Sequence, residues 1–152
     1  MLAASANAGN RAWRAYLSTQ GQGAVNARDR IGKGPWHNAR GGLIAQNLDE
    51  LHSLMHRIRA QDALTEDGSV IPGSGFSPNR HDILTGSKLD GTAFPAGDDM
   101  TCRNWTSSDA GKARIGHHDR AAWNSAHDTR GCGQEALRES GGDGLFYCFA
   151  AE

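Results

Sequence analysis

The sequence has no long apolar stretch, and none of its short apolar runs approaches the ~20 residues that a membrane-spanning helix needs. No membrane span is therefore predicted. The first six residues contain no basic side chain, and their apolar stretch is too short for a signal peptide. If the protein is exported, its export signal is expected upstream of this sequence or already removed.

An excess of one charge sign is also missing. The chain has 16 Lys and Arg against 17 Asp and Glu, which gives a formal net charge of -1. The basic residues do not form one continuous run. Because a nucleic-acid interface is a basic face on a domain of high isoelectric point, nucleic acid is not expected as a partner.

Cysteine is scarce, and its spacing excludes the common structural zinc motifs. Cys102, Cys132 and Cys148 all lie in the last third of the chain, and none belongs to a Cys-x-x-Cys pair. In an oxidising compartment the simplest partition is one disulfide and one unpaired cysteine, whereas in the cytosol all three would be free thiols. A bridge between Cys102 and Cys132, for example, would close a loop of about thirty residues and stabilise the fold by ~3–4 kcal/mol.

Glycine, by contrast, is abundant, with 20 residues against 4 prolines, and it indicates many turns and irregular loops. Four Trp, four Phe and two Tyr are spread along the chain, which is not typical of disordered sequences. A length of 152 residues suits one domain with a real core. We therefore predict a single domain over residues 1–152.

Short strand patterns dominate the predicted secondary structure. They cover residues 13–18, 82–86, 104–107, 112–116 and 145–149. No alternation of strands and helices and no internal repeat is present, so the chain is predicted to be α+β with an antiparallel sheet. The stretch from Asn104 to Cys132 has little regular pattern, and long irregular loops in compact domains are usually functional.

Two helical segments are expected. Residues 47–55 form the better one, because Asn47 can cap it, Glu50 completes a capping box, and Leu48, Leu51, Leu54 and Met55 form one apolar stripe. The Ala-rich residues 2–8 read as the end of another helix.

Three segments carry a resemblance to a known family. They are Trp-Arg-Ala-Tyr-Leu-Ser at 13–18, Cys-Arg-Asn-Trp-Thr at 102–106, and Gly-Cys at 131–132 followed by Leu-Phe-Tyr-Cys-Phe at 145–149. In this order they resemble the C-type-lectin-like superfamily, and most closely its endostatin-like branch, the C-terminal domain of certain collagens. Bacterial exported proteins carry similar domains. The resemblance implies a C-type-lectin-like fold: small antiparallel sheets, one or two helices and a long irregular loop braced by a disulfide.

The same resemblance implies the cysteine pairing. Cys102 would bond to Cys132 and brace the long loop, and Cys148 would bond to a cysteine in the first helix. Residues 2–8 contain no cysteine, so the domain is expected to lack part of that helix. Cys148 is then expected to be a free thiol, buried by the final strand.

The family also implies a function. It is that of a non-catalytic, lectin-like binding module of a secreted, periplasmic or cell-surface protein, which recognises a glycan or an extracellular protein through the loop from Trp105 to Cys132. The Ca²⁺-dependent sugar-binding members carry a Glu-Pro-Asn or Gln-Pro-Asp triplet and a Trp-Asn-Asp strand. None of these is present here, and residues 105–107 lack the carboxylate. Sugar binding through Ca²⁺ by that pattern is therefore not expected.

Histidines beside aspartates are the most unusual feature of the long loop. A His–Asp pair orients an imidazole and raises its basicity, which metal sites and general bases both need. The ligand-binding residues are predicted to be His117, His118, Asp119, Arg120, Trp123, Asn124 and His127, with Trp36 and Trp123 exposed in loops.

Two interpretations of these pairs stay open. Either no cofactor binds and the pairs form a polar network that holds the loop, or His117, Asp119 and His127 bind Zn²⁺ or Ca²⁺. The metal interpretation allows a metal-dependent hydrolase as an alternative function. A third possibility is a structural or assembly domain with an exposed apolar patch near residues 1–18. No Gly-x-Ser-x-Gly motif is present, and no catalytic residue is predicted.

Overall fold

Short helices and short strands joined by long loops form the protein. The computed structural model describes residues 9 and 11–151. The helices are α2 (Ala27–Arg30), α3 (Leu48–Leu51), α4 (Cys102–Trp105) and α5 (Gln134–Ser140), and the strands are β1 (Trp13–Ala15), β2 (Trp36–His37), β3 (Leu43–Ala45), β4 (Asp82–Leu84), β5 (Arg114–His117), β6 (His127–Asp128), β7 (Gly142–Phe146) and β8 (Cys148–Ala150). This content confirms the α+β class.

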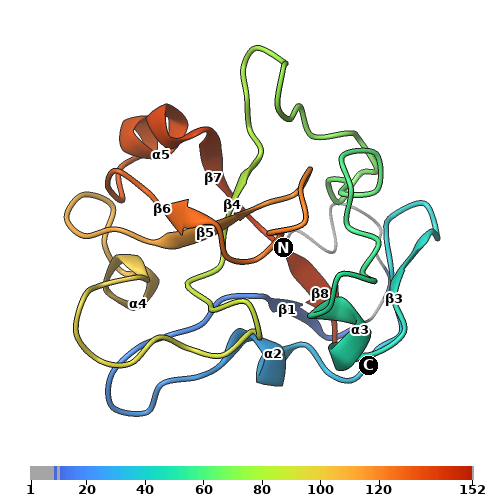
Figure 1. Ribbon diagram of the computed structural model, residues 1–152, viewed down its shortest axis with the longest axis horizontal. Helices are drawn as coiled ribbons and strands as arrows, with labels where there is room; N and C mark the ends of the chain where they lie inside the picture. The colour runs from blue at the N-terminus through green and yellow to red at the C-terminus, as the bar shows by residue number, and fades with distance from the viewer. Residues whose placement is uncertain (1–8, 10, 152) are drawn as a thin grey trace.

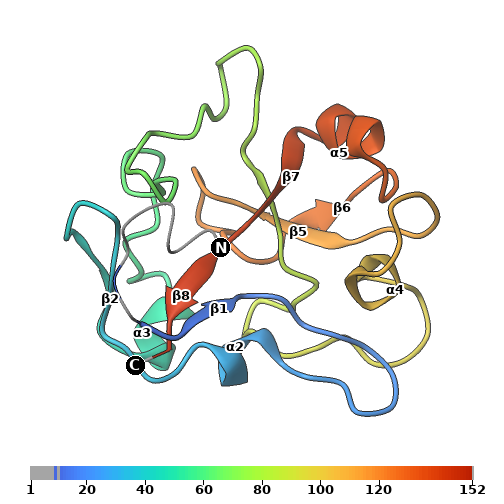
Figure 2. The ribbon, with the colours of Figure 1, turned by 180° about the vertical axis from the view of Figure 1, so that it is seen from behind.

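A four-stranded sheet with the order β6-β5-β4-β7 is the largest regular element. β5 is antiparallel to both β4 and β6, as predicted, whereas β7 runs parallel to β4. Figures 1 and 2 show α4 and α5 at the same end of the molecule as this sheet, and α3 with the β2–β3 pair at the other end. The prediction of a purely antiparallel arrangement is therefore wrong for one strand pair.

The segment 145–149, predicted as one strand, is divided between two sheets. β7 ends at Phe146, and β8 begins at Cys148 and pairs with β1 in antiparallel register, so that Ala15 faces Cys148. Phe149 points into the core and is buried, so its neighbour Cys148 projects to the opposite side of the strand. Cys148 is free, as predicted, but it is exposed rather than buried.

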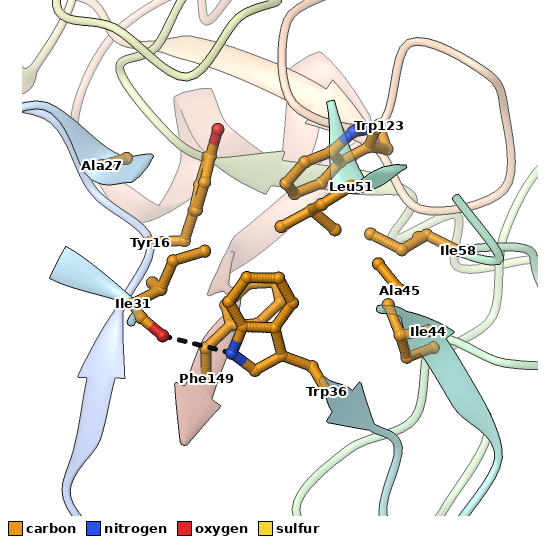
Figure 3. Packing of buried hydrophobic residues seen from close by; sticks show 10 residues of the cluster. All are labelled: Tyr16, Ala27, Ile31, Trp36, Ile44, Ala45, Leu51, Ile58, Trp123 and Phe149. Carbon is orange, nitrogen blue, oxygen red and sulfur yellow. Dashed lines mark hydrogen bonds between the residues drawn. The ribbon is translucent and has the colours of Figure 1, made fainter. Parts of the chain in front are cut away.

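Aromatic side chains from distant segments build the main core (Figure 3). The rings of Tyr16 and Trp123 lie 4.9 Å apart, and those of Trp36 and Phe149 lie 5.5 Å apart in an edge-on arrangement. Trp36 donates its indole N–H to the carbonyl of Ile31 at 3.1 Å. The predicted exposure of Trp36 and Trp123 is wrong, because a chain with few large apolar residues uses these loop tryptophans to fill its core.

The disulfide joins Cys102 to Cys132 across a separation of 30 residues, as the resemblance implied. The two cysteines and Ala113 form a second small core, on which Leu84 and Trp105 pack.

Residues 104–107 do not form the predicted strand. Residues 102–105 all have positive φ, between 48° and 65°, and fold into the single left-handed turn of α4. Each non-glycine residue in this conformation costs ~1–2 kcal/mol. The carboxylate of Asp99, which accepts the backbone N–H of Arg103 at 2.9 Å, and the disulfide at Cys102 hold the turn.

The helix predicted over 47–55 is shorter than expected. Asn47 caps it as predicted, since its side-chain oxygen accepts the N–H of Glu50 at 2.9 Å. The helix ends at Leu51, and Leu54 and Met55 are 80% and 72% exposed. The prediction of a buried apolar stripe is therefore wrong beyond Leu51, because the chain turns away from the core there.

Two further points concern the chain as a whole. The helix expected at residues 2–8 lies outside the described residues, and so does half of the segment 1–18, for which an apolar patch was considered. Among the residues that the structure describes, no helix has the length and apolarity required to cross a bilayer.

Candidate metal centre

Three histidines surround one buried carboxylate where the two inner strands of the four-stranded sheet, β4 and β5, begin and end. Oδ1 of Asp82 lies 3.2 Å from Nε2 of His81 and 3.2 Å from Nε2 of His117. Nε2 of His127 lies 3.6 Å from the same oxygen. We call these four residues the His/Asp cluster.

Strand register brings the cluster together. Asp82 at the start of β4 stands directly opposite His117 at the end of β5. His127 in β6 stands opposite Ile115, two residues before His117, and residues two apart on a strand share a face. His117 and His127 are therefore diagonal neighbours on one face, within reach of each other.

The imidazole rings of the cluster also contact one another. His81 stacks on His117, with ring centroids 4.3 Å apart and an angle of 14° between the planes. The rings of His117 and His127 are 5.1 Å apart. This packing places three ring nitrogens on the same side as the Asp82 carboxylate.

The interior of the cluster is polar but lacks hydrogen bonds. Asp82 is only 3% exposed, and neither of its carboxylate oxygens has a hydrogen-bond partner among the described residues; the same holds for Nε2 of His117. Burial raises the pKa of Asp82 to about 6 and lowers the pKa of His117 to about 4. Both shifts report the cost of placing charge there without compensation.

Two outer atoms of the cluster, Nδ1 of His81 and Nδ1 of His127, have hydrogen-bond partners. Nδ1 of His81 lies 3.1 Å from a carboxylate oxygen of Asp119 and 2.9 Å from the Ser74 hydroxyl. Nδ1 of His127 lies 3.1 Å from the backbone carbonyl of Asp128. When each Nδ1 donates its proton outwards, the Nε2 lone pair faces the centre of the cluster.

Asp119 is held in place as a partner of His81. Burial opposes its ionisation, but hydrogen bonds from the backbone and side chain of Ser74, together with His81, lower the pKa of Asp119 to about 2. The Ser74 N–H donates to the second carboxylate oxygen at 2.7 Å. A Cβ at Gly73 would lie 2.7 Å from that oxygen, so the glycine permits this close approach.

The spacing of the donor atoms suits a small divalent cation. One nitrogen each of His81 and His117 and one oxygen of Asp82 lie within 4.8 Å of one another, and His127 does not belong to this group although its Nε2 lies 3.6 Å from Oδ1 of Asp82. Tetrahedral zinc with bonds of ~2.1 Å has ligand atoms roughly 3.4 Å apart, which matches the contacts of 3.2 to 3.6 Å around Oδ1 of Asp82. Ca²⁺ takes six to eight oxygen ligands, and one carboxylate does not supply them.

Gly141 keeps one side of the cluster open. It ends α5 with a φ of 107°, a conformation that favours glycine. A Cβ at this position would lie 3.3 Å from Nε2 of His81 and 3.4 Å from Oδ2 of Asp82. The absence of a side chain therefore leaves room beside two of the donors.

The structure brings together only part of the predicted ligand-binding set. His117 and His127 belong to the cluster, whereas Asp119 supports His81 from behind. Arg120 is exposed beside them and donates to the Ser74 hydroxyl at 3.1 Å.

Three predicted contact residues are buried. Trp123 is 2% exposed and packs in the aromatic core, and His118 is fully buried. The side-chain amide of Asn124 donates to the Tyr16 hydroxyl at 3.0 Å and to the carbonyl of Leu89 at 3.0 Å. The loop turns these three side chains inward, so they are not at the surface, and their role as ligand contacts stays a prediction.

His81 and Asp82 were missed as site residues. The sequence shows them as a His–Asp pair at the start of a predicted strand, and His117 directly follows another predicted strand. Pairing these two strands in antiparallel register would have placed Asp82 beside His117. The pairing partner, however, lies 35 residues away and no local pattern specifies it.

No protein-family model matches the chain, and no match to it was found among curated proteins or among solved structures. Its candidate site is therefore defined by the geometry described above.

Proposed function

We propose that this protein is a non-catalytic binding domain that holds Zn²⁺ through His81, Asp82 and His117, with the exposed side chain of His127 moving inwards to supply a fourth ligand. The observation that carries the proposal is the Asp82 carboxylate, which is almost completely buried, has no hydrogen bond, and faces three imidazole nitrogens. A buried carboxylate in this state is costly unless a cation or hydrogen bonds compensate it. A zinc ion would compensate it and use the nitrogens of His81 and His117, and that of His127 once its exposed side chain moves inwards.

A purely structural polar network fits the contacts less well. Such a network is retained because it satisfies buried polar atoms. Here the atoms that point outwards, Nδ1 of His81 and of His127, have partners, and the atoms that point inwards do not. This division between inner and outer atoms is typical of metal ligands with a supporting second layer.

Binding without turnover is favoured by the number of donors. With His127 moved inwards, four protein ligands complete a tetrahedral zinc site of the structural kind, whereas a catalytic zinc keeps a position for water or substrate. The alternative of a metal-dependent hydrolase would require His127 to stay unbound. Its longer contact of 3.6 Å and its 45% side-chain exposure are the observations in favour of that alternative.

The wider setting supports a lectin-like module. The loop from Trp105 to Cys132, braced by the disulfide, carries both His117 and His127. We propose that the fold is C-type-lectin-like and endostatin-like, with this loop as the surface that meets a glycan or an extracellular protein. The disulfide is compatible with an oxidising, extracellular compartment.

Metal analysis tests the proposal directly. The purified chain, stripped with chelator and reloaded, should retain one zinc per molecule and no Ca²⁺. His117→Ala and Asp82→Asn should each weaken zinc binding more than a hundredfold. His37→Ala, which removes an exposed histidine of β2, should leave it unchanged. Substoichiometric zinc in the wild type, or wild-type affinity in His117→Ala, would overturn the proposal.

A further inference from the structure

A shallow polar depression adjoins the His/Asp cluster at Gly141. The loop before β4 contributes Arg80, the helix α5 contributes Arg138 and Glu139, and the start of β7 contributes Asp143. Gly141 belongs to its lining and lies beside the donors of His81 and Asp82, as described above. A molecule seated in the depression would therefore lie next to a metal held by the cluster.

Two arginines in the depression share one carboxylate. Nε of Arg80 lies 3.1 Å from Oδ2 of Asp143, and Nε of Arg138 lies 2.8 Å from Oδ1. Both guanidinium groups use Nε for this contact, and among the described residues neither uses its terminal nitrogens in a hydrogen bond. Asp143 thus holds two guanidinium groups side by side, with their remaining N–H groups free to donate.

The charge of this surface depends on the metal. Within the depression, the positive charges of Arg80 and Arg138 are balanced by Asp143 and by Glu139, which also lies 3.7 Å from Arg130. With the Asp82 carboxylate beside it and Arg130 next to Glu139, positive and negative charges are equal in number when no metal is bound. The two positive charges of Zn²⁺ are then not balanced. A bound Zn²⁺ therefore makes the surface positive.

We propose, on the basis of the zinc site proposed above, that this depression binds an oxyanion, the carboxylate or phosphate group of the ligand, and that it does so in the zinc-loaded protein. Guanidinium groups match the geometry of both oxyanions through paired N–H donors. An exposed Arg–Asp pair contributes only ~0–1 kcal/mol, so an incoming anion can engage these arginines at little cost. A neutral ligand would gain nothing from the two free guanidinium edges or from the charge of the metal.

Three probes with one sugar ring test the proposal. Glucuronate carries a carboxylate, glucose 6-phosphate carries a phosphate, and glucose is neutral. Each is titrated into the zinc-loaded, isotope-labelled full chain and followed by the amide shifts of Gly141 and Gly142. We expect millimolar binding of at least one charged probe, at least tenfold weaker binding of glucose, and at least tenfold weaker binding of the charged probe after removal of zinc.

Arginine variants separate recognition from simple charge attraction. Arg80→Gln and Arg138→Gln should each weaken binding of the charged probe at least fivefold while retaining one zinc per chain. Arg57→Gln is the matched control, because Arg57 is also exposed and paired to one carboxylate, that of Glu50. It should bind as the wild type does.

The outcomes keep the two proposals distinct. A preference for glucuronate assigns a carboxylate ligand, and a preference for glucose 6-phosphate assigns a phosphate ligand. The oxyanion site would be overturned, and the metal site left intact, by either of two results. Glucose could bind as tightly as both charged probes, or no probe could bind to protein that contains zinc. Failure to load zinc would overturn the metal site itself. Since linkage is reciprocal, the bound anion should also tighten zinc binding by the factor that zinc tightens anion binding.

Discussion

Two buried regions of this protein contain histidine beside other polar groups, and they treat those groups differently. In the aromatic core, the Tyr16 hydroxyl lies 2.8 Å from Nε2 of His52 and accepts the Asn124 amide at 3.0 Å, and Nδ1 of His52 contacts the Leu48 carbonyl at 2.8 Å. In the His/Asp cluster, the inward-facing atoms of Asp82 and His117 have no such partners. The ring nitrogens of the fully buried His118 also have none among the described residues, so what distinguishes the cluster is that its unpartnered atoms converge on one carboxylate oxygen.

The difference separates polar groups that hold the fold from polar groups arranged for a ligand. A core network stabilises only when its members are satisfied by one another. In a metal site without its ion, the donor atoms have no partners. Favourable interactions elsewhere in the fold offset the free-energy cost of burying them. Changes in the aromatic core and changes in the His/Asp cluster should therefore differ in their effects on stability and on zinc binding.

Trp123→Ala should be the most destabilising single change. It removes a buried ring that packs on Tyr16 at 4.9 Å and on Tyr147 at 5.3 Å, and truncation of a large core aromatic costs ~3–5 kcal/mol. Urea unfolding of the metal-free protein measures this loss. A loss below 1 kcal/mol would mean that Trp123 is not part of the core, and would favour its predicted role as a ligand contact.

Zinc should stabilise the wild type and not His117→Ala. An ion that binds only the folded state adds ~2.7 kcal/mol to the free energy of unfolding at a hundred times its dissociation constant. Unfolding is followed with zinc and with chelator in both proteins. Equal stabilisation of wild type and variant would place the bound zinc elsewhere.

Asn124→Ala and Asp82→Asn should have different effects on the free energy of unfolding of the metal-free protein. Asn124→Ala leaves partners of the core network unsatisfied and should cost ~1–3 kcal/mol. Asp82→Asn removes a buried charge that lacks compensation, so the free energy of unfolding should stay the same or rise, although zinc binding is lost. If Asp82→Asn destabilises as much as Asn124→Ala, Asp82 is a structural hub and not a ligand.

Asp119→Asn should weaken zinc binding without preventing it. Loss of the carboxylate that orients a metal-bound histidine typically lowers affinity 10–100-fold. Asp109→Asn, at an exposed position on the same long loop, is the control and should have no effect. Competition with a chromophoric chelator measures both. If Asp119→Asn binds zinc as tightly as the wild type does, Asp119 does not orient His81 for metal binding.

The part of the pH dependence that Asp82 and His117 contribute in the metal-free protein should be the smallest effect. It adds to the stability lost on acidification through His52, His56 and His118, whose pKa values burial also lowers. The raised pKa of Asp82, about 6, makes the folded state take up a proton first, which adds stability as the pH falls. The lowered pKa of His117, about 4, makes the unfolded state take up a proton first, which removes stability over the same interval. These contributions oppose each other in the wild type.

Asp82→Asn isolates the histidine contribution. Its free energy of unfolding should fall more steeply than that of the wild type between pH ~6.5, the ordinary value for histidine, and the pKa of His117 near 4. Urea unfolding at stepped pH, with chelator present throughout, provides the comparison. Parallel profiles would show that Asp82 is not protonated in the folded state over this interval.

Local sequence patterns were sufficient for several elements. Alternation placed β4 and β5 close to their positions, the cap at Asn47 was identified from residue type, and glycine content indicated a loop-rich α+β chain. The Cys102–Cys132 bridge came from the family resemblance, and the structure contains it. The helix α5 was missed because its seven residues carry only one buried apolar side chain, Leu137.

The sequence by itself determined the kinds of side chain available: a loop rich in His and Asp, and cysteines that can form one disulfide. It also has few large apolar residues, so its tryptophans are needed to fill the core. Only the tertiary structure decided which His and Asp act together. The register between β4 and β5 sets His81 and Asp82 against His117, and β6 adds His127. The β4–β5 pairing joins segments more than thirty residues apart, and packing of the whole chain selects it. Adjacent positions in the sequence, such as His117 and His118, were divided between the site and the interior because His117 is the last residue of β5 and His118 begins the turn that follows it.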